Sequence, residues 1–300
     1  MKKVLLSLLA IVVGTSAFAQ ILNVASIDKI STPKGTMVAG ISPKGDYVLL
    51  TGMQLEGLAK FDLATGKTEV LTDALGAGNE AKISADGKTV VYREDVFVNG
   101  LRYTDVVSKN IATGARLELA KATRNLNSMS LQGGNAVLVN SGRVSQKRVS
   151  SAVPAVKSAP IVSIDNCQLM ITNNGVTKIL SPNGKQYSYI WASVSPNGKK
   201  VCYYVCGVGC FISNIDGSDV KELGILRAAH WYNDNTVVGM RDYDDGHTIT
   251  SSTIVAMTID GKRQQLTSDS MIAMYPYASV ENKKIAFTTL DGESYIINVK

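Results

Sequence analysis

A short turn phrase recurs along the whole chain, and its spacing constrains the fold more than any other feature. The phrase reads DLATGK, NIATGA, ITNNGV, NIDGSD and TIDGKR, and its glycines are Gly66, Gly114, Gly175, Gly217 and Gly261. Successive glycines are 48, 61, 42 and 44 residues apart. A repeat of about 40 to 45 residues, built from short alternating polar and apolar runs, is typical of four-stranded propeller blades. The 61-residue interval then predicts one unit with an insertion.

A second phrase precedes the first in each unit. It reads ISPKGDYVLL from Ile41, ISADGKTVVY from Ile83 and VSPNGKKVCYY from Val194, with weaker copies near residues 130, 232 and 280. Pro, Gly and Asp or Asn favour a tight hairpin turn, because each suits a backbone angle or a local hydrogen bond that the turn needs. The apolar run that follows predicts the next strand. Six copies predict six units.

The last unit lacks residues for a fourth strand, and the run ILNVASIDKIS near the N-terminus belongs to no unit. Pairing of this run with the last blade would close the ring and remove an open sheet edge. We therefore predict an all-β fold, a six-bladed β-propeller of four-stranded antiparallel blades closed by the N-terminal strand. The single domain spans residues 20–300, and its predicted blades are 33–73, 78–121, 126–182, 188–224, 225–268, and 273–300 together with 21–32.

The phrases SPKGDYVLL, SADGKTVVY and SPNGKKVCYY, combined with DLATGK and NIDGSD, resemble the repeat of TolB-type propellers. The propeller domains of the dipeptidyl peptidase IV and prolyl oligopeptidase families have a similar repeat. The resemblance covers about residues 21–300 and implies a fold rather than an activity. Because no G-x-S-x-G nucleophile motif occurs in the sequence, we do not expect a serine peptidase.

The first 19 residues have the three parts of a secretory signal peptide. Lys2 and Lys3 are positively charged, residues 4–13 are apolar, and Ala17 and Ala19 form a small-x-small cleavage site. The apolar run is shorter than the roughly 20 residues of a spanning helix. Because the cleavage site has no Cys, we predict a periplasmic or secreted protein with neither a lipid anchor nor a membrane span.

Acidic residues and one of the two histidines gather in the RDYDDGHTIT segment. Asp242, Asp244, Asp245 and His247 offer oxygen ligands and an imidazole to a divalent cation. The alternative interpretation is an acidic loop that is only solvated. The other histidine, His230, lies on a predicted first strand, where we interpret it as a part-buried structural residue.

Aromatic residues occur at the predicted connections between blades, where they would gather at the mouth of the central channel. Such rings can stack on sugars or hold a peptide, although they can equally fill space between blades. The predicted ligand-binding set at the mouth is Tyr187, Tyr189, Trp191, Trp231, Arg241, Tyr275 and Tyr277. Arg93 and Tyr103 are predicted near the same rim, where the arginines either meet an anionic ligand or are simply solvated.

Cys206 and Cys210 flank a predicted hairpin tip, where opposed residues lie within reach of a disulfide. We therefore consider a bond between them, with free thiols as the alternative. The stretch 141–160 carries basic and no acidic residues. It is interpreted as the insertion of the third unit, either a loop that contacts an acidic partner or polysaccharide or an extended hairpin over the blade edge.

We predict a non-enzymatic binding module, monomeric and exported, that engages a protein, peptide or glycan of the cell envelope. The net charge of +6 is mildly basic and no nucleic-acid-binding motif is present, so we expect no nucleic-acid partner. The alternative is a propeller lyase or hydrolase with a metal-assisted site at the channel mouth. A sensor or scaffold subunit is a third possibility. We expect no cofactor unless a divalent cation binds at residues 242–247.

Overall fold

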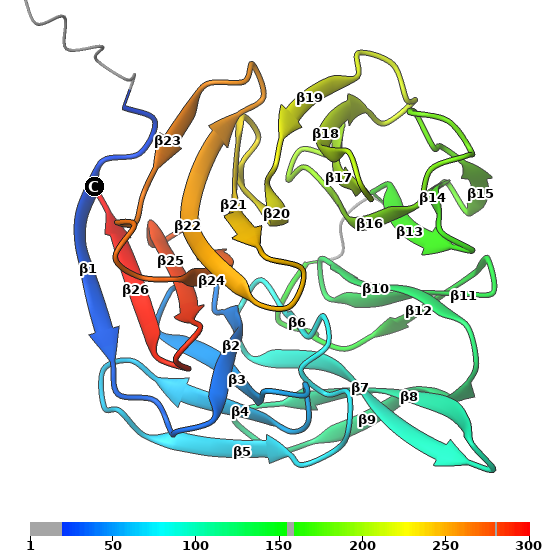
Figure 1. Ribbon diagram of the computed structural model, residues 1–300. Coiled ribbons are helices and arrows are strands. Elements are labelled where there is room, and N and C mark those ends of the chain that lie inside the picture. The colour runs from blue at the N-terminus through cyan, green and yellow to red at the C-terminus, as the bar shows by residue number, and fades with distance from the viewer. Residues whose placement is uncertain (1–19, 155–158, 280) are drawn as a thin grey trace, which may run out of the picture.

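The computed structural model describes residues 20–154, 159–279 and 281–300, so the predicted signal peptide at residues 1–19 lies outside the described residues. Every regular element in the described ranges is a β-strand, and the strands form seven antiparallel sheets arranged around a central axis (Figure 1). This part of the chain holds no helix long and apolar enough to cross a membrane.

Each sheet is one blade, and we number the blades in chain order. Blade 1 contains β2 (Thr36–Ile41), β3 (Tyr47–Gly52), β4 (Leu58–Asp62) and β5 (Thr68–Thr72). Blade 2 contains β6 (Lys82–Ile83), β7 (Thr89–Val98), β8 (Leu101–Asn110) and β9 (Arg116–Thr123). Blade 3 contains β10 (Leu126–Gln132), β11 (Asn135–Asn140) and β12 (Arg143–Arg148), and blade 4 contains β13 (Ile161–Asp165), β14 (Gln168–Asn173) and β15 (Val176–Ile179).

The remaining three blades again have four strands each. Blade 5 contains β16 (Tyr189–Val194), β17 (Lys200–Val205), β18 (Gly209–Asn214) and β19 (Lys221–Gly224). Blade 6 contains β20 (Arg227–Asn233), β21 (Thr236–Asp244), β22 (Ile249–Thr258) and β23 (Arg263–Gln265). Blade 7 contains β24 (Ala273–Ser279), β25 (Lys284–Thr289) and β26 (Ser294–Val299), with β1 (Val24–Ile30) as its outer strand.

The closure of the ring by the N-terminal strand is confirmed. β1 pairs antiparallel with β26, with Ile27 opposite Ile297. The segment just before β1 is also held by blade 6, because the side-chain amide of Gln264 accepts from the backbone N–H of Leu22 at 2.7 Å and donates to the carbonyl of Leu22 at 2.9 Å. The first described residues therefore connect the last two blades.

The prediction of six blades is wrong, because the predicted third unit, 126–182, forms two separate blades. Within the described residues, blades 3 and 4 have three strands each, whereas the other five have four. The stretch 141–160 is therefore not an insertion in a blade. Residues 143–148 form β12, an exposed strand paired along its length with β11, and a connection to β13 follows.

Strand number explains why the two short blades are neighbours. Each strand takes the chain from one face of the ring to the other. Four antiparallel strands therefore return the chain to the face where the blade began, whereas three strands leave it on the opposite face. β13 accordingly runs antiparallel to β10. The side chain of Asn127, at the start of β10, donates to Asp165 at the end of β13, and that of Gln132, at the end of β10, donates to Ala159 just before β13. A second three-stranded blade restores the direction for β16.

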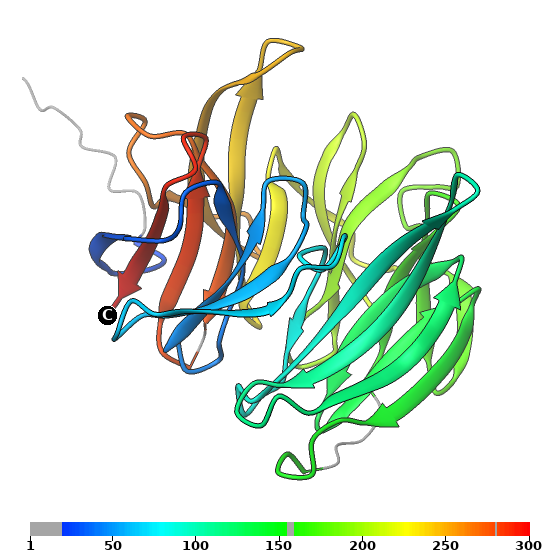
Figure 2. The same cartoon turned by 90° about the horizontal axis from the view of Figure 1, so that it is seen from below.

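One face of the ring carries the hairpins between the first and second strands of the four-stranded blades, and we call it the turn face. These hairpins contact one another around the ring. The hydroxyl of Tyr47 donates to the carbonyl of Gly87, and Asn282 donates to the carbonyl of Lys44. The opposite face is the loop face, from which the long hairpins β7–β8 and β21–β22 project (Figure 2).

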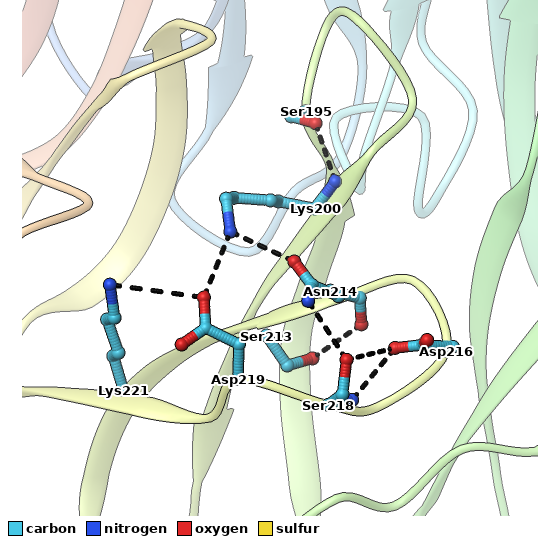
Figure 3. Close-up of polar contacts among 8 residues, drawn as sticks. All are labelled: Ser195, Lys200, Ser213, Asn214, Asp216, Ser218, Asp219 and Lys221. Carbon is cyan, nitrogen blue, oxygen red and sulfur yellow. Dashed lines mark hydrogen bonds and ion pairs between the residues drawn. The ribbon is translucent and has the colours of Figure 1, made fainter.

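The recurring phrases form the turns that the sequence predicted. In blade 5 the hydroxyl oxygen of Ser195 accepts from the backbone N–H of Lys200 at 3.0 Å, which closes the SPNGK turn (Figure 3). In the NIDGSD turn, Ser218 donates to Asp216 at 2.6 Å and accepts from Asn214 at 2.9 Å. These side chains satisfy local backbone and side-chain groups, so their recurrence reflects turn formation rather than ligand binding.

The apolar core lies between the blades. Alternate residues of the second strands face opposite neighbours, as expected for strands buried on both faces. On β7, Val90 and Tyr92 pack in a cluster with blade 1, whereas Val91 packs with Met129 of blade 3. The blades are thus held together by apolar side chains.

Candidate functional site

The first strands of blades 5, 6 and 7 share a β-bulge that exposes or reorients one side chain. In each bulge two residues oppose one partner residue, and the first of the two has positive φ. The residues are Trp191 with φ of 50°, Ala228 with φ of 47° and Tyr275 with φ of 52°. Such backbone angles are costly for residues other than glycine, and bulges of this kind commonly redirect side chains beside functional sites.

Directly after the bulges of blades 6 and 7 come the equivalent residues His230 and Tyr277, which lie against one another. Their ring centroids are 4.7 Å apart. Burial lowers the pKa of His230 from its usual 6.5 to about 4 and raises that of Tyr277 to about 12. His230 is therefore a neutral, half-buried packing residue at neutral pH, as the sequence predicted, and is poorly suited to act as a base.

The predicted aromatic set divides into exposed and structural residues. Tyr187 and Trp191 are 36% and 39% exposed, whereas Tyr189 is fully buried. The hydroxyl of Tyr189 donates to the carbonyl of Gly184 at 3.0 Å, which holds the loop before β16. The indole N–H of Trp231 donates to the carbonyl of Ser193 at 3.3 Å, so that ring bridges blades 5 and 6.

Arg241 does not join the aromatic set at the channel. It lies on β21, where its guanidinium donates to the hydroxyl of Tyr243 at 2.5 Å and packs over that ring at 5.3 Å from the centroid. With neighbouring Ser, Thr, Gln and Asp side chains it lines a shallow hollow of about 60 Å³. This hollow is too small for more than a few water molecules.

The structure does not assemble the predicted metal site. Asp242 is buried and bound to Arg227 at 2.7 Å, while Asp245 accepts from the backbone N–H groups of His247 and Thr248. Burial raises the pKa of Asp242, and those backbone N–H groups lower the pKa of Asp245. In the described ranges no three His, Cys, Asp or Glu residues are grouped so as to hold a metal ion. The acidic residues of this hairpin, Asp244 included, are engaged by Arg227 or by the turn itself.

The disulfide between Cys206 and Cys210 is not formed, because the hairpin register differs from the one expected. Cys210 pairs with Tyr204 across the strands, and Cys206 lies beyond the last pair. Cys210 instead lies in the core with its sulfur 3.6 Å from that of Cys202, whereas Cys206 is exposed. The contact with Cys202 and burial together raise the pKa of the Cys210 thiol.

A polar pocket of about 290 Å³ lies at the loop-face end of blades 2, 3 and 4. It is lined by the three arginines Arg93, Arg102 and Arg124, by Asp165, and by asparagines of the neighbouring connections. The sequence predicted only Arg93 near a rim and missed the other two arginines and Asp165. The Asn-Gly turn at residues 99–100 was the available signal, since a two-residue hairpin fixes the register of β7 and β8.

The structure resembles solved propellers, while no protein-family model and no curated protein matches the sequence. Similarity to TolB from Acinetobacter baumannii extends over 84% of this chain and 57% of that chain, with a TM-score of 0.52 and 17% identity. The chain thus spans little more than half the length of that protein.

A second similar structure is assigned as TolB from Agrobacterium tumefaciens. It matches 91% of this chain and 96% of that chain, with a TM-score of 0.53 and 16% identity. The fold is that of a TolB-like β-propeller. A chain of a mitotic checkpoint complex is also similar, with a TM-score of 0.56, 12% identity and coverage of 93% and 95%. At these identities the likeness of the TolB-like propeller to other proteins concerns the fold alone.

Proposed function

We propose that this TolB-like propeller is an exported, non-enzymatic binding module that engages a protein, peptide or glycan of the cell envelope. The binding surface is the loop-face end of the channel, where Tyr187 and Trp191 are exposed. Binding requires no reactive group there, and the residues suited to acid–base or metal chemistry, such as His230 and Asp242, are engaged in packing or ion pairing.

Trp191 is the observation that carries the proposal. Its backbone adopts a φ of 50° and the residue is 39% exposed, with an edge-on contact between the indole and Tyr204 at 5.6 Å between centroids. A tryptophan in this position loses apolar contacts and adopts an unfavourable backbone angle. The fold does not require a large side chain there, because the smaller Ala228 occupies the equivalent position on blade 6. An aromatic ring held in one orientation and left accessible suits recognition of a peptide or a sugar.

Site-specific photo-crosslinking in the native host tests this surface. A photoreactive amino acid at Trp191 or Tyr187 is expected to give a discrete adduct with an envelope protein or glycan. The matched control is Lys199, an exposed residue of the same blade on the turn face. Adducts of equal yield from Lys199, or none from either loop-face position, would contradict the proposal.

Export is tested separately by fractionation and N-terminal sequencing. Lys2, Lys3 and the apolar run that follows support a signal peptide, with cleavage after Ala19. We expect periplasmic or secreted protein that begins at Gln20. Uncleaved protein retained in the cytoplasm would show that the assignment of residues 1–19 is wrong.

A further inference from the structure

Arg93 is a buried cation whose surroundings in the protein leave it only partly compensated. Its side chain is 10% exposed, and a terminal nitrogen reaches Glu80 only at 3.5 Å. Its Nε is buried and has no hydrogen-bond partner within the described part of the chain. A buried guanidinium normally has its N–H donors satisfied, because an unpaired buried charge is strongly unfavourable. Arg93 also lines the 290 Å³ pocket.

The strand register explains how the arginines come to one side of blade 2. Residues two apart on a strand share a face, so Arg93 follows Val91 on the side that packs against blade 3. Phe97 follows Arg93 at an even spacing on β7 and therefore lies on the same face. Arg102 on β8 pairs with Phe97, so its side chain lies on that face too. The apolar core between blades 2 and 3 therefore ends in cationic side chains at the loop face.

The other two arginines retain donors for a ligand. Arg102 approaches Asp95 only at 4.0 Å, beyond hydrogen-bond distance, and it is 56% exposed. Arg124 packs over the ring of Tyr103, with the guanidinium carbon 5.1 Å from the centroid. That contact uses the face of the guanidinium and leaves its N–H edges available. The protein itself thus supplies these three cations with one long hydrogen bond to a carboxylate, from Arg93 to Glu80 at 3.5 Å, and with the 4.0 Å ion pair between Arg102 and Asp95.

Among the described residues that line the pocket, the one carboxylate is that of Asp165 on the opposite wall. Asp165 accepts from the side-chain amide of Asn127 at 3.2 Å, so it is oriented toward blade 3. Asp165 and Asn166 reach the loop face because β13 runs opposite to β10. Three arginines and one aspartate give the lining a net charge of about +2, which favours an anion.

We propose that this pocket binds a small ligand through an oxyanion, either a carboxylate or a phosphate group. Arg93 forms the floor of the site and completes its hydrogen bonding through Nε, and Arg102 and Arg124 close over the anion from the rim. Arginine suits this role because its planar donors match the oxygens of both groups. The asparagines beside Asp165 provide donors and acceptors to the rest of the ligand. The site is separate from Trp191 and does not depend on the binding surface proposed there.

Calorimetric titration with succinate and with inorganic phosphate, at constant ionic strength set by chloride, tests the proposal. We expect saturable 1:1 binding of at least one anion and a rise in melting temperature with its concentration. Arg93→Gln is expected to weaken binding by about tenfold or more, as is Arg124→Gln, an exposed position where folding is not at risk. The matched control is Arg263→Gln, an exposed arginine on β23 that should bind as the unmodified protein does.

The two probes distinguish the possible ligands. Binding of succinate alone assigns a carboxylate, and binding of phosphate alone assigns a phosphate group. Equal weakening by Arg263→Gln would show that the anions respond only to overall charge. That result, unaltered binding by both Arg93→Gln and Arg124→Gln, or the absence of saturable binding of either probe would overturn the proposal.

Discussion

Acidification should destabilise the protein through His230 in particular. Burial lowers the pKa of His230 from 6.5 to about 4, with Lys82 lowering it further and Glu80 opposing. The unfolded chain therefore takes up a proton on this residue below pH 6.5, while the folded chain resists until about pH 4. Stability from the neutral ring is fully present above pH 6.5 and is lost as the pH falls toward 4.

The size of the effect follows from the two pKa values. A pKa difference of one corresponds to about 1.4 kcal/mol, so the change from 6.5 to about 4 is worth at most about 3 kcal/mol. Between pH 7.5 and 4.5 the linkage relation gives a loss of about 2.5 kcal/mol. For a typical domain this is a large fraction of the total stability.

Urea unfolding at pH 7.5 and 4.5 measures the loss, and the chain provides its own control. It has two histidines, and His247 is exposed in the β21–β22 hairpin. On acidification, the free energy of unfolding should fall by about 2.5 kcal/mol more in the wild type and in His247→Gln than in His230→Gln. This difference does not depend on how much each substitution changes the stability at neutral pH. NMR titration should show that the imidazole of His230 titrates near pH 4. Titration of His230 near pH 6.5, or equal losses in both variants, would refute the reasoning.

Three further predictions follow from burial and packing. Phe287→Ala should reduce the free energy of unfolding by about 3 to 5 kcal/mol in urea denaturation, because the ring is fully buried and stacks on Tyr295 at 5.4 Å; a loss below about 1 kcal/mol would contradict the packing of blade 7. Gly134→Ala should lower the free energy of unfolding by about 1 to 3 kcal/mol, since its Cβ would clash with the backbone carbonyl oxygen of Ser150, just after β12; unchanged thermal unfolding would show that this carbonyl does not lie against Gly134. In native protein a thiol reagent should modify the exposed Cys167 and Cys206 rapidly, with the remaining two thiols released only by denaturant; two reactive thiols in total after unfolding under non-reducing conditions would indicate a disulfide.

The regular blades could be predicted because their information is local. Ser195 and Gly198 form their turn with residues a few positions away, so the same phrase recurs wherever the same turn is needed. The phrase at Gly175 is the reason why the predicted number of blades is wrong. It closes the β14–β15 hairpin of a three-stranded blade, yet it has the chemistry of the hairpin between the third and fourth strands elsewhere. Turn residues indicate that a hairpin forms, but they do not indicate which two strands of the blade it connects.

The candidate sites could be predicted only in part, because they depend on contacts between distant segments. Trp191 and Tyr187 are predicted at the channel mouth from their positions between blades, and they are exposed, while their binding of a ligand stays a prediction. The arginine pocket could be predicted only by knowing that β13 runs opposite to β10, because this direction brings Asp165 to blade 3. The 61-residue interval between turn glycines contained the evidence, since it is longer than one blade and fits two blades of three strands. The register of β17 and β18 likewise decided which cysteines meet.

An experimental structure of residues 20–300 tests most directly the claim that two three-stranded blades reverse the chain and build the arginine pocket. It should show seven blades, with residues 126–148 and 161–179 in separate sheets and Asp165 beside Asn127 at the loop face. Six blades, or a β13 strand that runs in the same direction as β10, would contradict the account and remove the pocket with it.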